Sequence, residues 1–289
     1  MSSMRNIKQR ISNISSVEQI IKAMDMVAST KLMKARTRLE GVRPIYQGLK
    51  RMVEETGYDD DAKKHPFYEE REVKNSLYII LTSDSGLSGG YNINISAKAL
   101  DHMNQGKSEK LLVVGAKGKE YFKKNGKNII HTIIDMEDAQ VYFNAEKLAK
   151  WIMESYLSGE TDEVFIAYTR FDTVLSYVPI VEKLLPAGTE VTEDESHSHK
   201  KYEPDINTFI DHIIPLYLHM NLFRAFSEAD TSEQAARMVN MDAAGKNASE
   251  MIDDLTLMYN RKRQADITQE LSEIVGSANI LNKGGPHDS

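Results

Sequence analysis

A glycine-rich stretch that follows an apolar segment is the part of this sequence whose residue types could most readily do chemistry. It runs from Thr82 to Asn92 and reads Thr-Ser-Asp-Ser-Gly-Leu-Ser-Gly-Gly-Tyr-Asn. In a parallel sheet, a loop at this place can bind phosphate through its backbone N–H groups. The spacing fits neither G-x-G-x-x-G nor G-x-x-x-x-G-K-[ST], and no lysine follows to reach a phosphate. We therefore expect a tight turn packed against a long helix, with nucleotide binding as the alternative.

The other residues with catalytic or metal-binding chemistry are sparse. Asp84 has no second carboxylate at a spacing that suggests a metal site. His197 and His199 supply two imidazoles without a third ligand, in the polar, turn-rich segment 187–205. The chain has no cysteine, which excludes disulfides and thiolate metal sites. The sequence therefore predicts no catalytic residues, no metal and no cofactor.

A long C-terminal helix, predicted over residues 207–282, is the dominant element of the chain. No proline occurs between Pro215 and Pro286, and good helix formers fill most positions. Its apolar residues step by three and four in two runs: Ala244, Ala248, Met251, Leu255 and Met258, then Ile267, Leu271, Ile274, Ala278 and Leu281. Between the runs lies the polar stretch 259–266, here called the collar, which could also be an ordinary solvated face. Residues 230–233 are either a capping box that starts a new helix or the surface of a continuous one.

The N-terminal segment 1–57 is predicted to be a second long helix that pairs with the first. Nine of eleven positions on a strict 4-3 repeat are apolar, which indicates a coiled coil. These apolar positions are Ile7, Ile11, Ile14, Ile21, Ala28, Leu32, Ala35, Leu39 and Val42. Pro44 should kink this helix or mark where the coil meets the globular part. The two terminal helices are thus expected to form an antiparallel coiled coil.

The middle of the chain, residues 75–190, changes to alternating strands and helices. Buried strands are expected over 76–82, 110–114, 128–134, 163–169 and, less cleanly, 174–181. Helices are expected over 93–104, 117–124 and 145–157. Strands that alternate with helices indicate parallel βαβ units. We therefore predict a Rossmann-like, three-layer α/β domain inserted between the terminal helices.

The charge is unevenly distributed along the chain. The formal net charge is −7, which argues against a general nucleic-acid binder. Residues 1–40 nevertheless carry eight basic and three acidic residues, so an acidic partner surface is expected there. No run approaches the roughly 18 apolar residues of a membrane span, and the first residues lack the apolar core of a signal peptide. The sequence predicts a protein that is soluble or peripheral to something else.

Three stretches resemble the gamma subunit of F-type ATP synthase. Residues 5–14 with 20–32 are similar to the N-terminal motif of that family, and residues 232–238, 241–244 and 259–276 are similar to its C-terminal motifs. The segment Gly86-Leu-Ser-Gly-Gly-Tyr-Asn92 matches the mid-chain loop of the family. The matches are collinear and cover both ends of the chain. In the middle domain the similarity lies mainly in the architecture.

This resemblance implies a central rotor shaft that couples ion-driven c-ring rotation to ATP synthesis or hydrolysis, without an active site of its own. The implied partners are three α and three β subunits, the ε subunit and the c-ring, at the cytoplasmic face of a bacterial cell membrane. The implied contacts to β subunits are Met24, Arg237, Arg263, Gln264, Thr268 and Glu270. The implied contacts to the c-ring and ε are Tyr202, Glu203 and Asp205. The sequence has no counterpart of the cysteine-bearing regulatory insertion of chloroplast members.

Two other functions remain open at this point. The first is a nucleotide- or phosphate-binding α/β enzyme with long helical arms, and the second is a static coiled-coil tether that holds a complex together without turning. The coupling ion, H⁺ or Na⁺, is not encoded in this chain, because the family binds that ion in other subunits.

Overall fold

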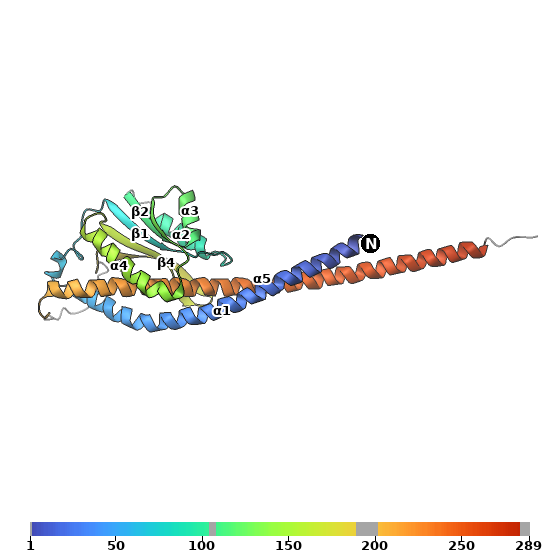
Figure 1. Cartoon of the computed structure of the whole chain (residues 1–289), viewed down its shortest axis with the longest axis horizontal. Coiled ribbons are helices and arrows are strands. Elements are labelled where there is room, and N and C mark those ends of the chain that lie inside the picture. Colours follow the sequence, from blue (N-terminus) through green and yellow to red (C-terminus); the bar gives the residue numbers. More distant parts are fainter. Residues whose placement is uncertain (1, 104–107, 189–201, 284–289) are drawn as a thin grey trace, which may run out of the picture. The chain divides into compact units, whose positions relative to one another are not determined.

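The computed structural model describes residues 2–103, 108–188 and 202–283, which form a mixed α/β protein (Figure 1). Along the sequence, a five-stranded sheet and three shorter helices come between two long helices, α1 (Ser2–Thr56) and α5 (Ile206–Lys283). The chain divides into two compact units. The first consists of the described parts of Met1–Met26 and Met241–Ser289, and the second of Val27–Asn240. His197 and His199 lie outside the described residues. The predicted mixed α/β class is confirmed.

The sheet of the second unit has the order β3-β2-β1-β4-β5. Its strands are β1 (Asn75–Leu81), β2 (Ser108–Val114), β3 (Ile129–Ile133), β4 (Glu163–Thr173) and β5 (Ser176–Leu185). The first four strands are parallel, with Ile79 of the central strand paired to Leu112 on one side and Ile166 on the other. A central parallel strand is covered on both faces, which explains why β1 is a continuous apolar run.

The last strand differs from the prediction of parallel βαβ units. β5 runs antiparallel to β4, and only Val174 and Leu175 lie between the two strands. A two-residue connection closes a hairpin, whereas a parallel strand needs a crossover of a dozen or more residues. The expectation that every strand alternates with a helix was therefore wrong here.

Helices cover both faces of the sheet. Tyr78 and Ile80 point into a core shared with α2 (Tyr91–Met103) and α3 (Ala116–Lys124). The alternate residues of β1, Leu77 and Ile79, point into the larger core. That core also contains residues of α4 (Val141–Leu157), α1 and α5. Two single-turn elements, η1 (Ala62–Lys64) and η2 (Asp138–Gln140), complete the second unit. This arrangement brings α5 close to the carboxyl ends of the central strands.

Within the second unit α1 and α5 run antiparallel along each other. Tyr46 stacks on Tyr217 with ring centroids 6.1 Å apart, while Arg38 pairs with Asp230 further along both helices. The 4-3 repeat of α1 is its buried side. Its buried members in this unit are Ala28, Leu32, Ala35, Leu39, Val42, Tyr46, Leu49 and Val53.

The two long helices continue through both places where the sequence could have interrupted them. α1 continues through Pro44 to Thr56, and α5 continues through residues 230–233. Asp230 is part of the helix and binds Arg38 instead of capping a new helix. The capping-box alternative was therefore wrong, because a tertiary partner takes the side chain that would have served as the cap.

In the first unit the N-terminal part of α1 lies beside the C-terminal part of α5. A Cβ atom added to Gly245 would lie 3.6 Å from Cγ2 of Ile21, so even the smallest side chain at this position of α5 would be in van der Waals contact with α1. The repeat positions Ile7, Ile11, Ile14 and Ile21 are half-buried. The 4-3 repeat therefore continues to mark the less exposed side of α1.

Candidate functional site

The glycine loop, residues 82–92, packs against α5 at the carboxyl end of β1. Nη2 of Arg237 donates to Oγ of Ser85 over 2.8 Å, and the Tyr91 hydroxyl donates to the carbonyl of Ala229 over 2.9 Å. Gly89 has φ +58°, and a Cβ atom there would lie 2.7 Å from the Asn240 side chain. The left-handed conformation favours glycine at this position, and the Asn240 side chain would have to move to admit a Cβ atom. The predicted tight turn packed against a long helix is confirmed.

Asp84 fastens the base of the glycine loop to two other loops. Its Oδ1 accepts from the backbone N–H of Ala116 and its Oδ2 from that of Asp135, both over 2.9 Å. Asp135 itself has φ +53°, a conformation that this bond helps to hold. The Asp84 carboxylate, for which the sequence predicted no metal site, therefore joins three connections at the carboxyl ends of the strands.

Removing this carboxylate should measurably destabilise the second unit. We expect Asp84→Ala to cost about 1.5–3 kcal/mol, since hydrogen bonds to a charged group are worth about that much. Asp84→Asn, which keeps one acceptor oxygen, should cost less than the alanine variant. The single tryptophan, Trp151, lies in α4 of this unit, so its fluorescence during urea unfolding measures the effect. Equal stability of all three proteins would contradict this role of Asp84.

Arg237 was expected to contact a β subunit, but its side chain is largely used inside the chain. It is 8% exposed. Its Nη2 donates to Oε1 of Glu233 over 2.6 Å as well as to Ser85, and its Nη1 donates to Oε1 of Gln234 over 3.0 Å. The arginine therefore links the glycine loop to α5.

The distal part of α5 carries apolar side chains on its surface. Leu271 and Ile274 are 58% and 64% exposed. The other large exposed apolar residues of this stretch are Met251, Leu257, Met258, Ile267 and Val275. In the first unit α1 contributes about 25 residues and α5 about 43, which at about 1.5 Å per residue leaves some 25 Å of α5 without a partner helix. The described members of the second apolar run, Ile267, Leu271 and Ile274, were expected to be buried in a seam and are exposed in the single chain.

The expected β-subunit contacts on this stretch all lie at the surface. Arg263, Gln264, Thr268 and Glu270 are exposed, and Met24 of α1 is half-buried. The Thr268 hydroxyl donates to the carbonyl of Gln264 over 2.8 Å, so it is occupied within the helix. The structure thus brings the four α5 residues onto neighbouring turns of one helix, in the first unit, whereas Arg237 belongs to the second.

The three residues expected at a c-ring contact lie at the start of α5. Asp205 accepts from the backbone N–H of Thr208 over 3.0 Å and from its hydroxyl over 2.7 Å, which caps the helix. These hydrogen bonds lower the pKa of Asp205. The Tyr202 ring lies 5.1 Å from that of Phe209, and Glu203 is exposed. The segment is therefore an ordered, exposed helix start.

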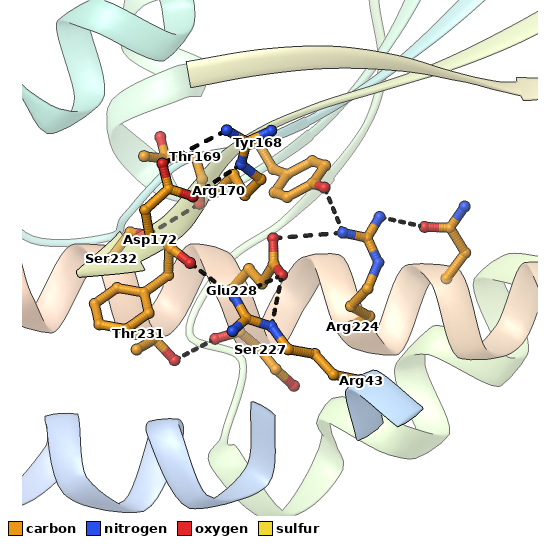
Figure 2. A network of polar contacts seen from close by, with 12 residues as sticks. Arg43, Tyr168, Thr169, Arg170, Asp172, Arg224, Ser227, Glu228, Thr231 and Ser232 are labelled. Atoms are coloured by element: carbon orange, nitrogen blue, oxygen red, sulfur yellow. Dashed lines mark hydrogen bonds and ion pairs between the residues drawn. The ribbon is translucent and has the colours of Figure 1, made fainter. Parts of the chain in front are cut away.

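Sequence reasoning missed a buried ion-pair network between α1, α5 and the sheet edge. Figure 2 shows Glu228 of α5 between Arg224 and Arg43, and the Tyr168 hydroxyl accepts from the same guanidinium nitrogen of Arg224 as Glu228 does. Nη2 of Arg224 donates to Oε2 of Glu182 over 2.7 Å, and Arg43 reaches Oε1 of Glu228 over 3.1 Å. The only signal in the sequence is the i, i+4 spacing of Arg224 and Glu228, because the other partners are distant in the chain.

No group of three or more histidine, aspartate or glutamate side chains in the described part of the chain could hold a metal ion. Within the same residues, no helix is both long and apolar enough to cross a bilayer.

An α/β unit flanked by two long helices, one of which exposes apolar and basic residues, defines a helical stalk protein. The family model described as ATP synthase matches residues 3–281. Among curated proteins, the ATP synthase gamma chain of Desulforamulus reducens is 38% identical over 97% of this chain and 100% of the relative. The gamma chain of Acetobacterium woodii, named sodium ion specific, is 37% identical over 96% of this chain and 98% of its own length. The chain belongs to the ATP synthase gamma-chain family, whose members are subunits of the central stalk.

Solved structures agree with this assignment. A chain of the Tetrahymena thermophila mitochondrial ATP synthase, from a structure titled central stalk/cring, covers 78% of this chain with a TM-score of 0.60 and 26% identity. A chain of the Euglena gracilis mitochondrial ATP synthase covers 100% of this chain with a TM-score of 0.70. At 18% identity, the second comparison supports the fold alone.

Proposed function

We propose that this chain is the turning shaft of a bacterial F-type ATP synthase, and that it transmits torque without catalysing a reaction itself. In this proposal its terminal helices form an antiparallel coiled coil inside a ring of three α and three β subunits. Residues 75–190 form a Rossmann-like domain at the base of the shaft, beside the ε subunit and the c-ring. The division into 1–57, 75–190 and 207–282 describes these three functional parts.

The observation that carries the proposal is the uncovered face of α5. Exposed apolar side chains such as Leu271 and Ile274 follow the collar along α5, and Arg261, Lys262 and Arg263 of the collar are also exposed. Several large apolar side chains exposed along one stretch of helix, next to charged residues, are typical of a protein interface. An enclosing ring of subunits would cover it from several sides, which a single partner helix cannot do.

The mechanism we infer is a bias on conformational equilibria. A shaft whose sides differ presents a different surface to each of three identical β subunits at any moment. It can shift their conformations only by the difference in contact free energy between the alternative states. Because the collar is basic, it suits an acidic partner loop. Met24, Arg263, Gln264, Thr268 and Glu270 are the residues we propose for these contacts, with Arg237 acting through the loop that it holds.

At the other end of the shaft, we propose that Tyr202, Glu203 and Asp205 contact the c-ring and the ε subunit. These residues are exposed or half-buried and sit on a capped helix start, so they could transmit force without local unfolding. The protein would then be peripheral at the cytoplasmic face of the cell membrane. Whether the enzyme is coupled to H⁺ or Na⁺ is decided in other subunits.

The alternative of a nucleotide-binding enzyme is weakened by the glycine loop. Its backbone approaches α5 at Gly89, and Arg237 is already bonded to Ser85, so both groups that could meet a phosphate are occupied. Isothermal titration of the purified chain with ATP and ADP distinguishes the two functions. Micromolar binding would favour the enzyme, and no detectable heat favours the shaft.

Crosslinking tests rotation against the static tether. Because the chain has no cysteine, Gln264→Cys together with one cysteine in a β subunit gives a single defined disulfide in the assembled enzyme. We expect oxidation to nearly abolish coupled ATP hydrolysis, because a shaft fixed to one β subunit cannot turn. Reduction should restore the activity of the same sample.

The matched control is Gln264→Cys without the β-subunit cysteine, treated with the same oxidant. It should keep its full hydrolysis rate, which separates the crosslink from damage by the oxidant. Full turnover by the completely crosslinked enzyme would eliminate rotation and leave the tether.

A further inference from the structure

The two outer strands of the sheet differ in how well their free edges are protected. In the part of the chain that the structure describes, β3 and β5 each pair with one strand only. β5 contains Pro179 and the charged residues Glu182 and Lys183. Proline and charge both oppose the addition of another strand. β3 contains no proline and no acidic, lysine or arginine side chain, so its edge is the unprotected one.

The backbone of Thr132 presents hydrogen-bonding groups at this edge. The carbonyl of Ile133 accepts from the N–H of Gly115, at the end of β2, over 2.8 Å, so the backbone groups of Ile133 face β2. Because successive residues of a strand turn their backbone groups to opposite sides, the N–H and carbonyl of Thr132 face away from β2. The described residues contain no further strand on that side. Such groups are a template for pairing with another strand.

The side chains along β3 also favour strand pairing. Residues 129–134 read Ile-Ile-His-Thr-Ile-Ile, and all except the histidine are strong β-formers. Ile130 is 41% exposed and Ile134 is 47% exposed. Six residues of high β-propensity, without proline, glycine or a permanent charge, are typical of segments that pair between chains. The edge therefore has a hydrophobic reason for a partner as well as a hydrogen-bonding one.

The charges at the two ends of β3 have opposite sign. Lysines precede the strand and acidic residues follow it: Lys123, Lys124 and Lys127, then Asp135, Glu137 and Asp138. Lys127 is paired with Glu109, and Asp138 lies 3.7 Å from Arg38, but the other four are exposed and have no ion-pair partner within the described residues. A second copy that runs in the opposite direction places the basic end of one strand against the acidic end of the other. A parallel arrangement would align like charges, which is unfavourable.

We propose that the edge of β3 is a self-association surface, at which two copies of the free chain pair their β3 strands antiparallel about a two-fold axis. The register that places Thr132 opposite its own copy also places Ile130 opposite Ile134 of the second copy. The two Thr132 backbones then bond to each other, and the exposed isoleucines cover each other. In the proposed function a single chain fills the ring, so this pairing concerns the chain before assembly. It goes beyond the proposed function and can fail independently of it.

The pairing should stop at two copies and should be weak. A two-fold interface uses the same surface of both copies, so neither β3 edge remains open, and each β5 edge keeps its protection. A five-residue strand with its flanks buries less than the roughly 800 Å² per partner of a standard stable interface. We therefore expect a dissociation constant on the order of 100 µM.

Sedimentation equilibrium of the purified full-length chain tests the pairing. Between about 10 µM and about 1 mM, the weight-average mass should rise from 32.7 kDa towards twice that value, as the expected dissociation constant requires. A mass that stays at 32.7 kDa over this range would overturn the proposal. So would an association that is equally strong in the β3 variants, because it would then come from another surface, such as the exposed apolar residues of α5.

Two variants should weaken the association at least tenfold. Thr132→Pro removes the outward N–H and leaves the hydrogen bonds to β2 in place, whereas Ile130→Lys keeps every backbone donor and puts a charge at the edge. Leu175→Lys is the matched control: Leu175 is 83% exposed in the β4–β5 connection, so this variant should associate like the parent. Urea unfolding followed by Trp151 fluorescence checks that each variant is folded. If Thr132→Pro does not fold, the comparison of Ile130→Lys with Leu175→Lys gives the answer.

Cysteine crosslinking tests the register, because any introduced cysteine is the only one in its chain. A short bifunctional thiol reagent should link Thr132→Cys to itself, and should link Ile130→Cys to Ile134→Cys when the two variants are mixed. Opposite Cβ atoms of an antiparallel pair lie about 4.5–5.5 Å apart. The two copies of residue 130 would be about 13 Å apart, so Ile130→Cys alone should link poorly. Efficient linking of Ile130→Cys to itself, without linking to Ile134→Cys, would show a parallel pair and refute the antiparallel one.

Discussion

Alanine at Gly115 should destabilise the second unit by about 3–5 kcal/mol, more than any other glycine-to-alanine change in the sheet region. Gly115 has φ +97° and ψ 139°, a conformation nearly confined to glycine, and forcing another residue into it costs about 1–3 kcal/mol. The new Cβ would also collide with the Thr82 carbonyl and would lie 2.7 Å from Oγ1 of Thr82. Overpacking of this kind adds about 1–3 kcal/mol.

The collision cannot be relieved by moving Thr82. Its N–H donates to the Val114 carbonyl over 2.9 Å, its hydroxyl donates to the same oxygen over 2.7 Å, and that hydroxyl accepts from the N–H of Gly118 over 2.9 Å. The threonine is therefore fixed to the ends of β2 and α3. Its displacement would break bonds at the point where the glycine loop begins.

Two other glycines separate the two causes of the effect. Gly126 has φ +67° and open space around its Cβ position, so Gly126→Ala should cost only about 1 kcal/mol. Gly118 has an ordinary helical conformation, but its Cβ would lie 2.5 Å from Oγ1 of Thr82, so Gly118→Ala should cost about 1–3 kcal/mol. Urea unfolding followed by Trp151 fluorescence measures all three. A cost for Gly115→Ala no larger than that for Gly126→Ala would contradict the packing argument.

Features with a local cause could be predicted from the sequence. The 4-3 repeat of α1 follows from the geometry of a helix with one buried side, and Ala28 to Val53 are buried as this repeat requires. The apolar strand segments were found because central parallel strands are buried on both faces. The glycine loop could be assigned as a turn because its spacing does not fit a phosphate site.

The remaining features depend on contacts between distant parts of the chain. The direction of β5 is an exception, because its signal was local: only four residues separate the expected strands 163–169 and 174–181, which is too few for the crossover that a parallel strand needs. The continuity of α5 at Asp230 depends on Arg38, nearly two hundred residues away, and local capping rules cannot include it. Arg237 was assigned to a partner by resemblance, whereas its contact with Ser85 appears only when the loop and helix are folded together.

The second large effect is expected at Arg224, where the network of Figure 2 is centred. Arg224 is 5% exposed and Glu228 is 3% exposed. The guanidinium bonds Glu182 and Asn221, each over 2.7 Å, and lies 4.1 Å from the centre of the Tyr46 ring. Breaking a buried ion pair from one side typically costs about 3–5 kcal/mol, because the remaining charge stays buried without its partner. We expect Arg224→Met to destabilise the second unit by that amount.

The pKa of Glu228 gives the physical reason why Arg224→Met should destabilise the second unit this strongly. Burial already raises it, and Arg224 and Arg43 act in the opposite direction. Without Arg224, the carboxylate keeps only Arg43, at 3.1 Å and on the more exposed side of the network. Arg224→Met/Glu228→Gln should therefore recover part of the loss, since it removes the uncompensated charge as well. Arg224→Lys should cost less than Arg224→Met but cannot bond Glu182, Asn221 and Tyr168 together, because an ammonium lacks the planar fork.

The same network connects α1, α5 and the β4–β5 hairpin to one another. Losing it should therefore destabilise the second unit as a whole and not one element alone. Arg43 belongs to α1, Arg224 and Glu228 to α5, and Glu182 to β5. Arg36→Met, which removes an exposed i, i+4 pair on α1, is the matched control and should change stability by less than about 0.5 kcal/mol. If Arg224→Met were as mild as Arg36→Met, the buried charges would not be coupled. The second unit would then be held together by its apolar core alone.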